Sequence, residues 1–485
     1  MIKILKLALM IGVLISCKQQ STTAQTATGK TIEKKAASTN KERIANYLDQ
    51  LENTGFSGSV LVAQHGKILL EKGYGYADRE NKVKYTTATV STIGSITKQF
   101  TGAAILVLEM QGKLSVTDKL TKYFNNVPDD KKNITLHHLL THSAGLPPAI
   151  GDDYEKITTD EFMNKAINRK LLFDPGTQYE YSNVGYSVLG IIIEKLSGMS
   201  YEEYLSENLW KPAGMYQTGY QLPSFDHIAV GYRKNSKWGR TTERAWATDG
   251  PFWHLRANGG VLSTPQDMYK WHTALLGNKI LSDDAKAKFY GKHIEEGEGA
   301  GSHYGYGWAI FPTPRNTELI AHNGGNGVFF ADFWRYLEED ITIFMMTNSV
   351  KRSYEHITSQ IAGILLKPDF IPEVSAEHPN PITGEMADQL IADFMDTVNT
   401  DNKDQWKSFL ERRTLSSFLN SFPMEEHLQF FNQFHTKLKV GKIAEVRLSE
   451  DEITLVVDTK TGPQKIDFNV ILIPDGSLKI DGIRM

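Results

Sequence analysis

Residues 94–112 read GSITKQFTGAAILVLEMQG, and this stretch has the pattern of a helix with one apolar face. Apolar residues recur at helical spacing along it, at Ile96, Phe100, Ala103, Ala104 and Val107. Gly112 follows as a stop signal. The pattern predicts a helix whose first turn carries Ser95 and Lys98. Because side chains three residues apart are neighbours on a helix, we expect the Lys98 amine to reach the Ser95 hydroxyl.

This pair has the chemistry that acyl transfer needs, which is a nucleophile with a base beside it. The partly positive end of a helix and apolar packing both favour a neutral lysine, the form that accepts a proton. Ser38 and Lys41 have the same spacing, but they lie in or next to a polar segment that cannot position a base. The sequence therefore predicts Ser95 as the nucleophile and Lys98 as its base.

A second motif, Tyr181-Ser182-Asn183, lies on a short connection before an apolar helix. A tyrosine beside a lysine can hold a lowered pKa and relay protons, and an asparagine amide can fix a substrate carbonyl. Taken alone, the motif also fits a cluster of tyrosines packed in an amphipathic segment, because Tyr179 and Tyr186 flank it.

A third motif, His322-Asn323-Gly324-Gly325, lies between a strand-like segment at 318–320 and a strand at 328–330. Glycines at this point would let a substrate lie close to the backbone. An exposed edge strand here could pair with an extended acyl chain. An amide hydrogen just after it could complete an oxyanion hole.

Strands are predicted on both sides of the long helical stretch. A hairpin is expected at 59–63 and 67–71, with Gly66 in its turn, and a late pair of strands at 327–334 and 340–346. Early and late strands that share one antiparallel sheet, with helices packed on it, make an α+β domain. We assign this domain to residues 41–366.

Four prolines fall close together after this domain, at 368, 372, 379 and 381, and they predict a linker over 367–384. The remaining residues, 385–485, are expected to form a small α+β domain with helices first and alternating strands afterwards. This order of elements resembles the cone-shaped fold of the nuclear transport factor 2 class. Such a domain could bind a partner of its own.

Residues 1–17 have the features of a secretory signal. Lys3 and Lys6 precede an apolar run at 7–15, which is shorter than the roughly 20 residues that a membrane-spanning helix needs. A retained transmembrane helix is therefore the weaker interpretation. Leu-Ile-Ser-Cys, ending at Cys17, resembles the lipobox of bacterial lipoproteins, which implies lipidation of Cys17; the alternative is a chance cysteine near an ordinary cleavage site.

Residues 18–40 are polar and have no apolar period, so they predict a flexible tether. A tether behind a lipid would hold the catalytic body close to a membrane. We expect an exported bacterial lipoprotein on the periplasmic face of the envelope or on the cell surface.

The overall charge argues against a nucleic-acid partner. The formal net charge is -4, so there is no excess of basic residues to neutralise phosphates. A metal site is also not expected. His138 and His142 are four residues apart, but Leu139 stands where the helical zinc-protease pattern needs glutamate. No cofactor is required by the predicted chemistry.

Two other segments have structural interpretations. Thr264 or Ser263 followed by Pro265 is typical of the start of a helix. Lys460-Thr461-Gly462 lies between two alternating strands and is interpreted as a hairpin turn.

The motifs Ser-x-x-Lys, Tyr-x-Asn and His-x-Gly, in this order, resemble the serine β-lactamase and penicillin-binding-protein superfamily. The similarity is to its class C β-lactamase-like branch, which includes esterases, D-aminopeptidases and carboxypeptidases, and it covers about residues 40–366. Three further segments resemble recurrent segments of that branch: Thr141–Pro147, Pro212–Met215 and Asn258–Thr264.

The resemblance implies that Ser95 becomes acylated, with Lys98 and Tyr181 exchanging the proton. It also implies that the backbone amides of Ser95 and Gly325 form the oxyanion hole. The expected reaction is hydrolysis of an amide or ester through an acyl-enzyme, on a D-amino-acid-containing peptide or a small ester. The alternatives are a non-catalytic ligand-binding or sensor lipoprotein with this fold, and a weak β-lactamase.

The resemblance assigns substrate binding to Asn183, His322 and Gly324. His322 stands where many relatives have a lysine, a permanent cation suited to a carboxylate, whereas histidine is able to be neutral at pH 7. Efficient β-lactam hydrolysis is therefore not expected. Large aromatic residues are candidates for the pocket wall, namely Phe252, Trp253 and Trp308, but spacing does not reveal which of them face the site.

Overall fold

The computed structural model describes residues 38–484, apart from 223, 234–235, 298, 375–381, 422, 449–451 and 474–475. The predicted signal peptide with Cys17, nearly all of the predicted tether and part of the predicted linker lie outside the described residues. Among the helices of the described part, none combines the length and the apolar character needed to cross a membrane.

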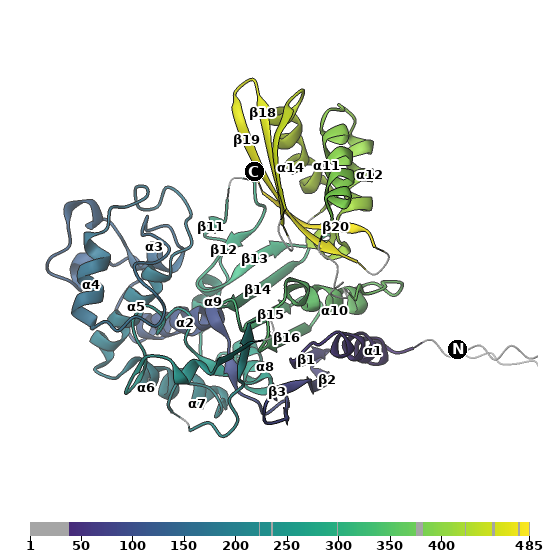
Figure 1. The fold of residues 1–485 in the computed structure, drawn as a ribbon. Coiled ribbons are helices and arrows are strands. Elements are labelled where there is room, and N and C mark those ends of the chain that lie inside the picture. Colours follow the sequence, from purple (N-terminus) through teal and green to yellow (C-terminus); the bar gives the residue numbers. More distant parts are fainter. Residues whose placement is uncertain are drawn as a thin grey trace, which may run out of the picture. The chain divides into compact units, whose positions relative to one another are not determined.

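An eight-stranded antiparallel sheet forms the centre of the domain predicted at residues 41–366 (Figure 1). Its order brings the first strands of the chain beside the last ones, since β1 pairs with both β2 and β16. This confirms the prediction that early and late strands share one antiparallel sheet in an α+β domain. In sheet order the strands are β11 Ile294–Glu295, β12 His303–Tyr304, β13 Ala309–Pro312, β14 Glu318–Gly325, β15 Phe330–Tyr336, β16 Ile341–Thr347, β1 Gly58–Gln64 and β2 Lys67–Tyr74.

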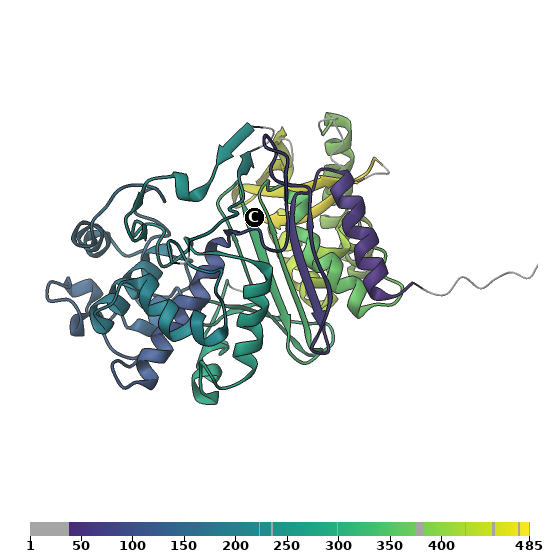
Figure 2. The ribbon, with the colours of Figure 1, turned by 90° about the horizontal axis from the view of Figure 1, so that it is seen from below.

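The sheet is buried on both faces because helices cover it from two sides (Figure 2). Strand β16 shows this, because successive side chains point to opposite faces of the sheet. Phe344 and Met346 belong to one apolar core, and Ile343 and Met345 belong to the other. Helices α1 Asn40–Asn53 and α10 Ile357–Leu366 cover the second core. Helix α1 buries the side chains that recur at helical spacing along it, Ile44, Tyr47, Leu48 and Leu51.

The first core lies between the sheet and the remaining helices of the body. Side-chain caps mark several helix starts, including the predicted one at Thr264, whose hydroxyl accepts from the Asp267 amide at 3.3 Å before Pro265 opens α8. These helices are α2 Thr97–Met110, α3 Leu136–Leu140, α4 Thr159–Asn168, α5 Asn183–Ser197, α6 Tyr201–Leu205, α7 Lys211–Ala213, α8 Pro265–Leu276 and α9 Asp283–Phe289.

Short strands and turns connect these elements. The two-residue and three-residue pairs are β3 Tyr76–Asp78 with β4 Val83–Lys84, β5 Ser91–Thr92 with β10 Leu262–Ser263, and β8 Trp246–Ala247 with β9 Gly250–Pro251; β6 Gly231–Arg233 pairs with β7 Ser236–Gly239. Tight turns are found at η1 Gly94–Ile96, η2 Leu120–Lys122, η3 Asp129–Lys131, η5 Thr241–Glu243 and η6 Arg352–His356, with a π-helical turn at η4 Ser206–Trp210.

The C-terminal part has its own apolar core and a four-stranded antiparallel sheet in the order β17-β18-β19-β20. Helices precede strands, as the sequence indicates, and Lys460-Thr461-Gly462 lies at the turn between β18 and β19. The nuclear transport factor 2-like cone stays a prediction. The elements are α11 Gly384–Val398, α12 Lys403–Arg413, α13 Ser416–Ser421, α14 Met424–Leu438, β17 Lys442–Leu448, β18 Glu452–Thr459, β19 Gly462–Leu472 and β20 Leu478–Arg484.

Candidate active site

Ser95 lies in η1, a single 3-10 turn that leads directly into α2. The turn begins at Gly94, whose φ of 53° is in the left-handed region that favours glycine. The structure thus places the serine one turn before the regular helix, and Lys98 in the first turn of α2. The predicted pair comes together, with Lys98 Nζ 3.1 Å from Ser95 Oγ.

The Lys98 amine is completely removed from solvent, with a side chain that is 0% exposed. Two further oxygen atoms lie 2.8 Å from its Nζ: Oδ1 of Asn183 on α5 and the backbone carbonyl oxygen of Asn258. Burial holds the pKa of Lys98 well below its ordinary value, and Asp153 opposes this only in part. Burial therefore favours the neutral form of the amine.

The three neighbours of Lys98 fit a neutral amine, which has two hydrogens and one lone pair. The carbonyl oxygens of Asn183 and Asn258 can only accept hydrogen bonds, so they take both hydrogens. The lone pair is left for the third neighbour, the Ser95 hydroxyl. This arrangement presents Lys98 as a base aimed at Ser95.

Tyr181 lies just before α5, with its hydroxyl hydrogen-bonded to Ser95 and its ring centroid 4.6 Å from Lys98 Nζ. Burial raises the pKa of Tyr181 above its ordinary value. The lowered pKa expected from the sequence is therefore wrong, because Lys98 is neutral and supplies no charge to stabilise a phenolate. The raised pKa favours the protonated form of Tyr181.

His142 is a site residue that sequence reasoning considered only as a metal ligand. It lies after α3 with φ of 58°, its Nδ1 accepts from the Ser182 amide at 3.0 Å, and its ring lies 4.3 Å from that of Tyr181. It therefore positions the Tyr181 segment. No group of three or more histidine, cysteine, aspartate or glutamate residues with the geometry of a metal site is found in the described part of the chain. The sequence signal that points to His142 is the segment 141–147, which resembles a recurrent segment of the superfamily branch.

His322 lies within β14, so the third motif ends one continuous strand instead of bridging two. Its Nδ1 lies 2.6 Å from the Asn323 carbonyl oxygen, which can only accept, so the proton resides on Nδ1. Its Nε2 then accepts from the Tyr304 hydroxyl at 2.9 Å. Burial lowers the pKa of His322 to about 3, so the ring is neutral at pH 7.

The predicted oxyanion donors lie where η1 and β14 approach each other closely. A Cβ atom added to Gly324 would lie 2.4 Å from the Ser95 amide nitrogen, and one added to Gly94 would lie 2.6 Å from the Gly325 nitrogen. Only glycine permits this approach. The two backbone amides therefore flank the same space beside Ser95, which is the arrangement that stabilises a developing oxyanion.

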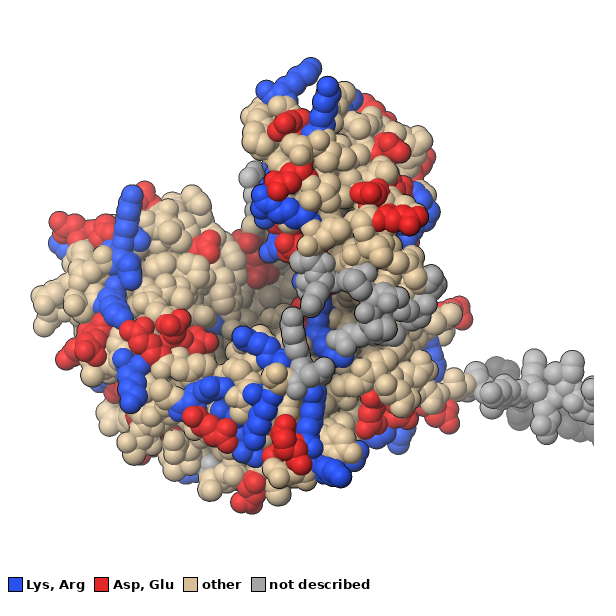
Figure 3. Space-filling model, in the orientation of Figure 1, with Lys and Arg blue, Asp and Glu red and all other residues tan. Residues whose placement is uncertain are grey.

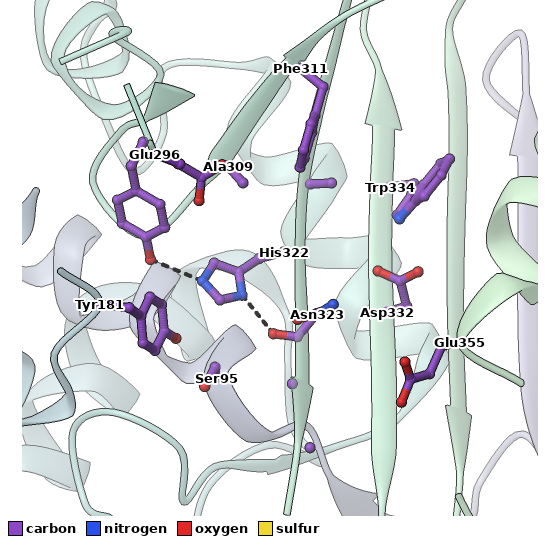
Figure 4. A pocket seen from close by; sticks show the side chains of 14 residues that line it. Ser95, Tyr181, Glu296, Ala309, Phe311, His322, Asn323, Asp332, Trp334 and Glu355 are labelled. Carbon is purple, nitrogen blue, oxygen red and sulfur yellow. Dashed lines mark hydrogen bonds between the residues drawn. The ribbon is translucent and has the colours of Figure 1, made fainter. Parts of the chain in front are cut away.

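A cavity of about 530 Å³ opens at Ser95 and runs along β14 (Figure 4). Figure 3 shows that the face seen there is hollowed, with acidic atoms at the edge of the hollow. Trp253 and Trp308, expected in the pocket wall, are 3% and 0% exposed and pack in the core, as does half-buried Phe252. The cavity is lined by Ser95, Tyr181, Glu296, Tyr304, Ala309, Phe311, Ala321, His322, Asn323, Gly324, Gly325, Asp332, Trp334 and Glu355.

Comparisons with known proteins give concordant results. The family described as Beta-lactamase matches residues 44–364. Penicillin-binding protein 4* of Bacillus subtilis (strain 168) is 28% identical over 350 residues, covering 67% of this chain and 76% of the relative. Other curated relatives are matched over 63% to 66% of their length.

Two solved structures share the fold. The octameric penicillin-binding protein homologue from Pyrococcus abyssi has a TM-score of 0.60 and 24% identity, covering 89% of this chain and 91% of that chain. D-amino acid amidase from Ochrobactrum anthropi SV3, complexed with L-phenylalanine amide, has a TM-score of 0.58 and 23% identity, covering 68% of this chain and 99% of that chain.

Substitution of Gly324 by alanine tests the close approach of η1 and β14. We expect the added Cβ to displace the oxyanion donors, so that turnover of an ester substrate falls about 10²- to 10³-fold. Gly277→Ala is the matched control, because a Cβ there meets nothing within 4 Å. Steady-state kinetics of both variants make the comparison, and a wild-type rate for Gly324→Ala would contradict the assignment.

The pH dependence of kcat/KM tests which group titrates. A base acts only when unprotonated, so activity should rise with pH through the lowered pKa of Lys98. His322 has a pKa of about 3, so it is neutral from about pH 5 upward. We expect His322→Gln to leave the acid limb of the profile in place. A limb centred near pH 6.5 that disappears in this variant would show that His322 is the titrating base.

Proposed function

Because the chain belongs to the beta-lactamase family of serine hydrolases, we propose that it hydrolyses an amide or ester through an acyl-enzyme on Ser95. D-Amino-acid-containing peptides and small esters are the proposed substrates. The observation that carries this proposal is the buried, neutral Lys98 amine 3.1 Å from Ser95 Oγ. A binding module has no need for a lysine held uncharged against a serine.

The geometry supports a balanced sequence of steps. Ser95 Oγ attacks the substrate carbonyl carbon while its proton passes to Nζ of Lys98, and the amides of Ser95 and Gly325 hold the negative oxygen. The bond to the leaving group then breaks, and the leaving group takes a proton delivered through Tyr181 and Lys98. Water attacks the acyl-enzyme next, its proton returns through Lys98, and the Ser95 hydroxyl is regenerated.

An amide substrate is supported by the likeness to D-amino acid amidase, a protein that shares this fold. The neutral His322 supports it too, since a cation suited to the carboxylate of a β-lactam is missing from the described cavity lining. We therefore place β-lactam turnover second to hydrolysis of amides and small esters.

The nucleophile and the base are tested by Ser95→Ala and Lys98→Met. We expect Ser95→Ala to abolish labelling by a fluorophosphonate probe and hydrolysis of p-nitrophenyl acetate. Lys98→Met should lower kcat about 10²- to 10⁴-fold, because it removes the base. Lys113→Met, at an exposed lysine beyond α2, is the matched control. Full labelling of the Ser95→Ala variant would refute the proposal.

We also propose that lipid on Cys17 anchors the protein to the outer side of a bacterial membrane. The proposal is supported by the signal-like residues 1–17 and the polar tether behind them. In cells that process lipoproteins, Cys17→Ser should move the protein from the membrane fraction to the soluble fraction, while Ser16→Ala should leave it membrane-bound. Membrane retention of Cys17→Ser would count against a lipid anchor.

A further inference from the structure

Glu296 is an acidic residue in the active-site cavity to which the reaction assigns no role. It follows β11 and lies in the segment that leads to β12. Its half-buried side chain lines the same cavity as Ser95. Figure 4 shows Glu296 on the same side of β14 as Ser95, Tyr181 and His322.

The carboxylate of Glu296 is held in place by the cluster that surrounds the catalytic tyrosine. The Tyr179 hydroxyl donates to Glu296 Oε1 at 3.2 Å, and Ser302 forms a second side-chain hydrogen bond. The Tyr179 ring centroid lies 5.8 Å from that of His142 and 5.9 Å from that of Tyr304. Glu296 is therefore tied by hydrogen bonds to the residues that surround Tyr181.

The negative charge of Glu296 meets no positive charge in the cavity. No lysine or arginine lines the described wall of this cavity, nor that of the small neighbouring cavity of about 40 Å³ that also reaches Ser95. Lys98 lies behind Ser95 with its neutral amine occupied by Asn183 and Asn258. Burial raises the pKa of Glu296, and a cation beside it would favour its charged form.

The aromatic lining suits a cation as well. Tyr181 and Tyr304 line the cavity together with Glu296. The faces of tyrosine rings attract ammonium groups, and the attraction is stronger when water is excluded. A carboxylate set among tyrosine rings, with no competing cation, is an arrangement that recognises an ammonium group.

We propose that Glu296 binds a protonated amine of the substrate, so that this enzyme prefers amides or esters of amino acids with a free amino group over uncharged or anionic ones. The inference rests on the proposed hydrolase function of the same site. It assigns Glu296 a role in specificity, separate from the chemistry at Ser95.

The test compares D-phenylalanine amide with its N-acetyl and N-succinyl derivatives at about pH 6.5, where an α-amino group is protonated. These substrates share the leaving group and differ in charge. For the wild-type enzyme we expect kcat/KM to be at least about tenfold higher for the free amine. Glu296→Gln should lower kcat/KM about tenfold or more for the amine, mainly through KM, and about threefold or less for the N-acetyl amide.

Two further variants make the result specific. Glu295→Gln removes the same charge one residue away, from an exposed side chain outside the cavity, and should leave the preference unchanged. Asp153→Asn removes the acidic side chain of the small neighbouring cavity. Loss of the preference in Asp153→Asn but not in Glu296→Gln would overturn the assignment, as would equal rates for all three wild-type substrates.

Failure of the inference is distinguishable from failure of the proposed function. If the wild-type protein hydrolyses p-nitrophenyl acetate and is labelled at Ser95 but shows no preference for the amine, only the role of Glu296 is wrong. A second readout needs no amide turnover: D-phenylalaninol should slow fluorophosphonate labelling of Ser95 more than uncharged 3-phenylpropanol does, and Glu296→Gln should remove that difference. Absence of both labelling and hydrolysis would overturn the function and this inference together.

Discussion

The removal of one lysine amine from water is the constraint on which the site depends. Lys98 has no exposed surface, and desolvation of this kind favours the uncharged form of an amine. A neutral amine in a dry interior must still satisfy its two hydrogens and its lone pair. Asn183 from α5 and the carbonyl of Asn258 meet the first demand, and Ser95 meets the second. The two acceptors lie 85 and 160 residues after Lys98 along the chain, so distant segments are brought to one nitrogen atom.

Much of this arrangement follows from local patterns. The apolar period of α2, the serine cap before α5 and the hairpin of β1 and β2 are short-range features, and spacing alone places Ser95 within reach of Lys98. Other parts depend on contacts that leave no mark in a single sequence. The hydrogen-bond acceptor that Asn258 offers to Lys98 is a backbone carbonyl, which every residue has. The position of His142 against Tyr181 depends on a left-handed backbone conformation after α3.

The aromatic residues show why residue spacing does not reveal which side chains form the pocket wall. Trp253 and Trp308 are large and apolar, and so are Phe311 and Trp334, yet the first two fill the core and the other two line the cavity. Trp253 and Trp308 lie outside the strands, between β9 and β10 and just before β13, so no strand alternation indicates which way their side chains point. The protonation of Tyr181 does not follow from the sequence either. Its pKa depends on whether the neighbouring lysine carries a charge, and burial disfavours that charge.

The free edge of β14 has a consequence for pairing with other strands. Strand β13 pairs with β14 only from Glu318 to Ala321, so His322 to Gly325 have a sheet neighbour on the β15 side alone. Exposed strand edges have unpaired backbone groups that can form hydrogen bonds with strands of other sheets. Here the free segment lies inside a cavity beside η1. Because η1 approaches this segment closely, the same contact that shapes the space beside Ser95 also shields a strand edge from pairing with other sheets.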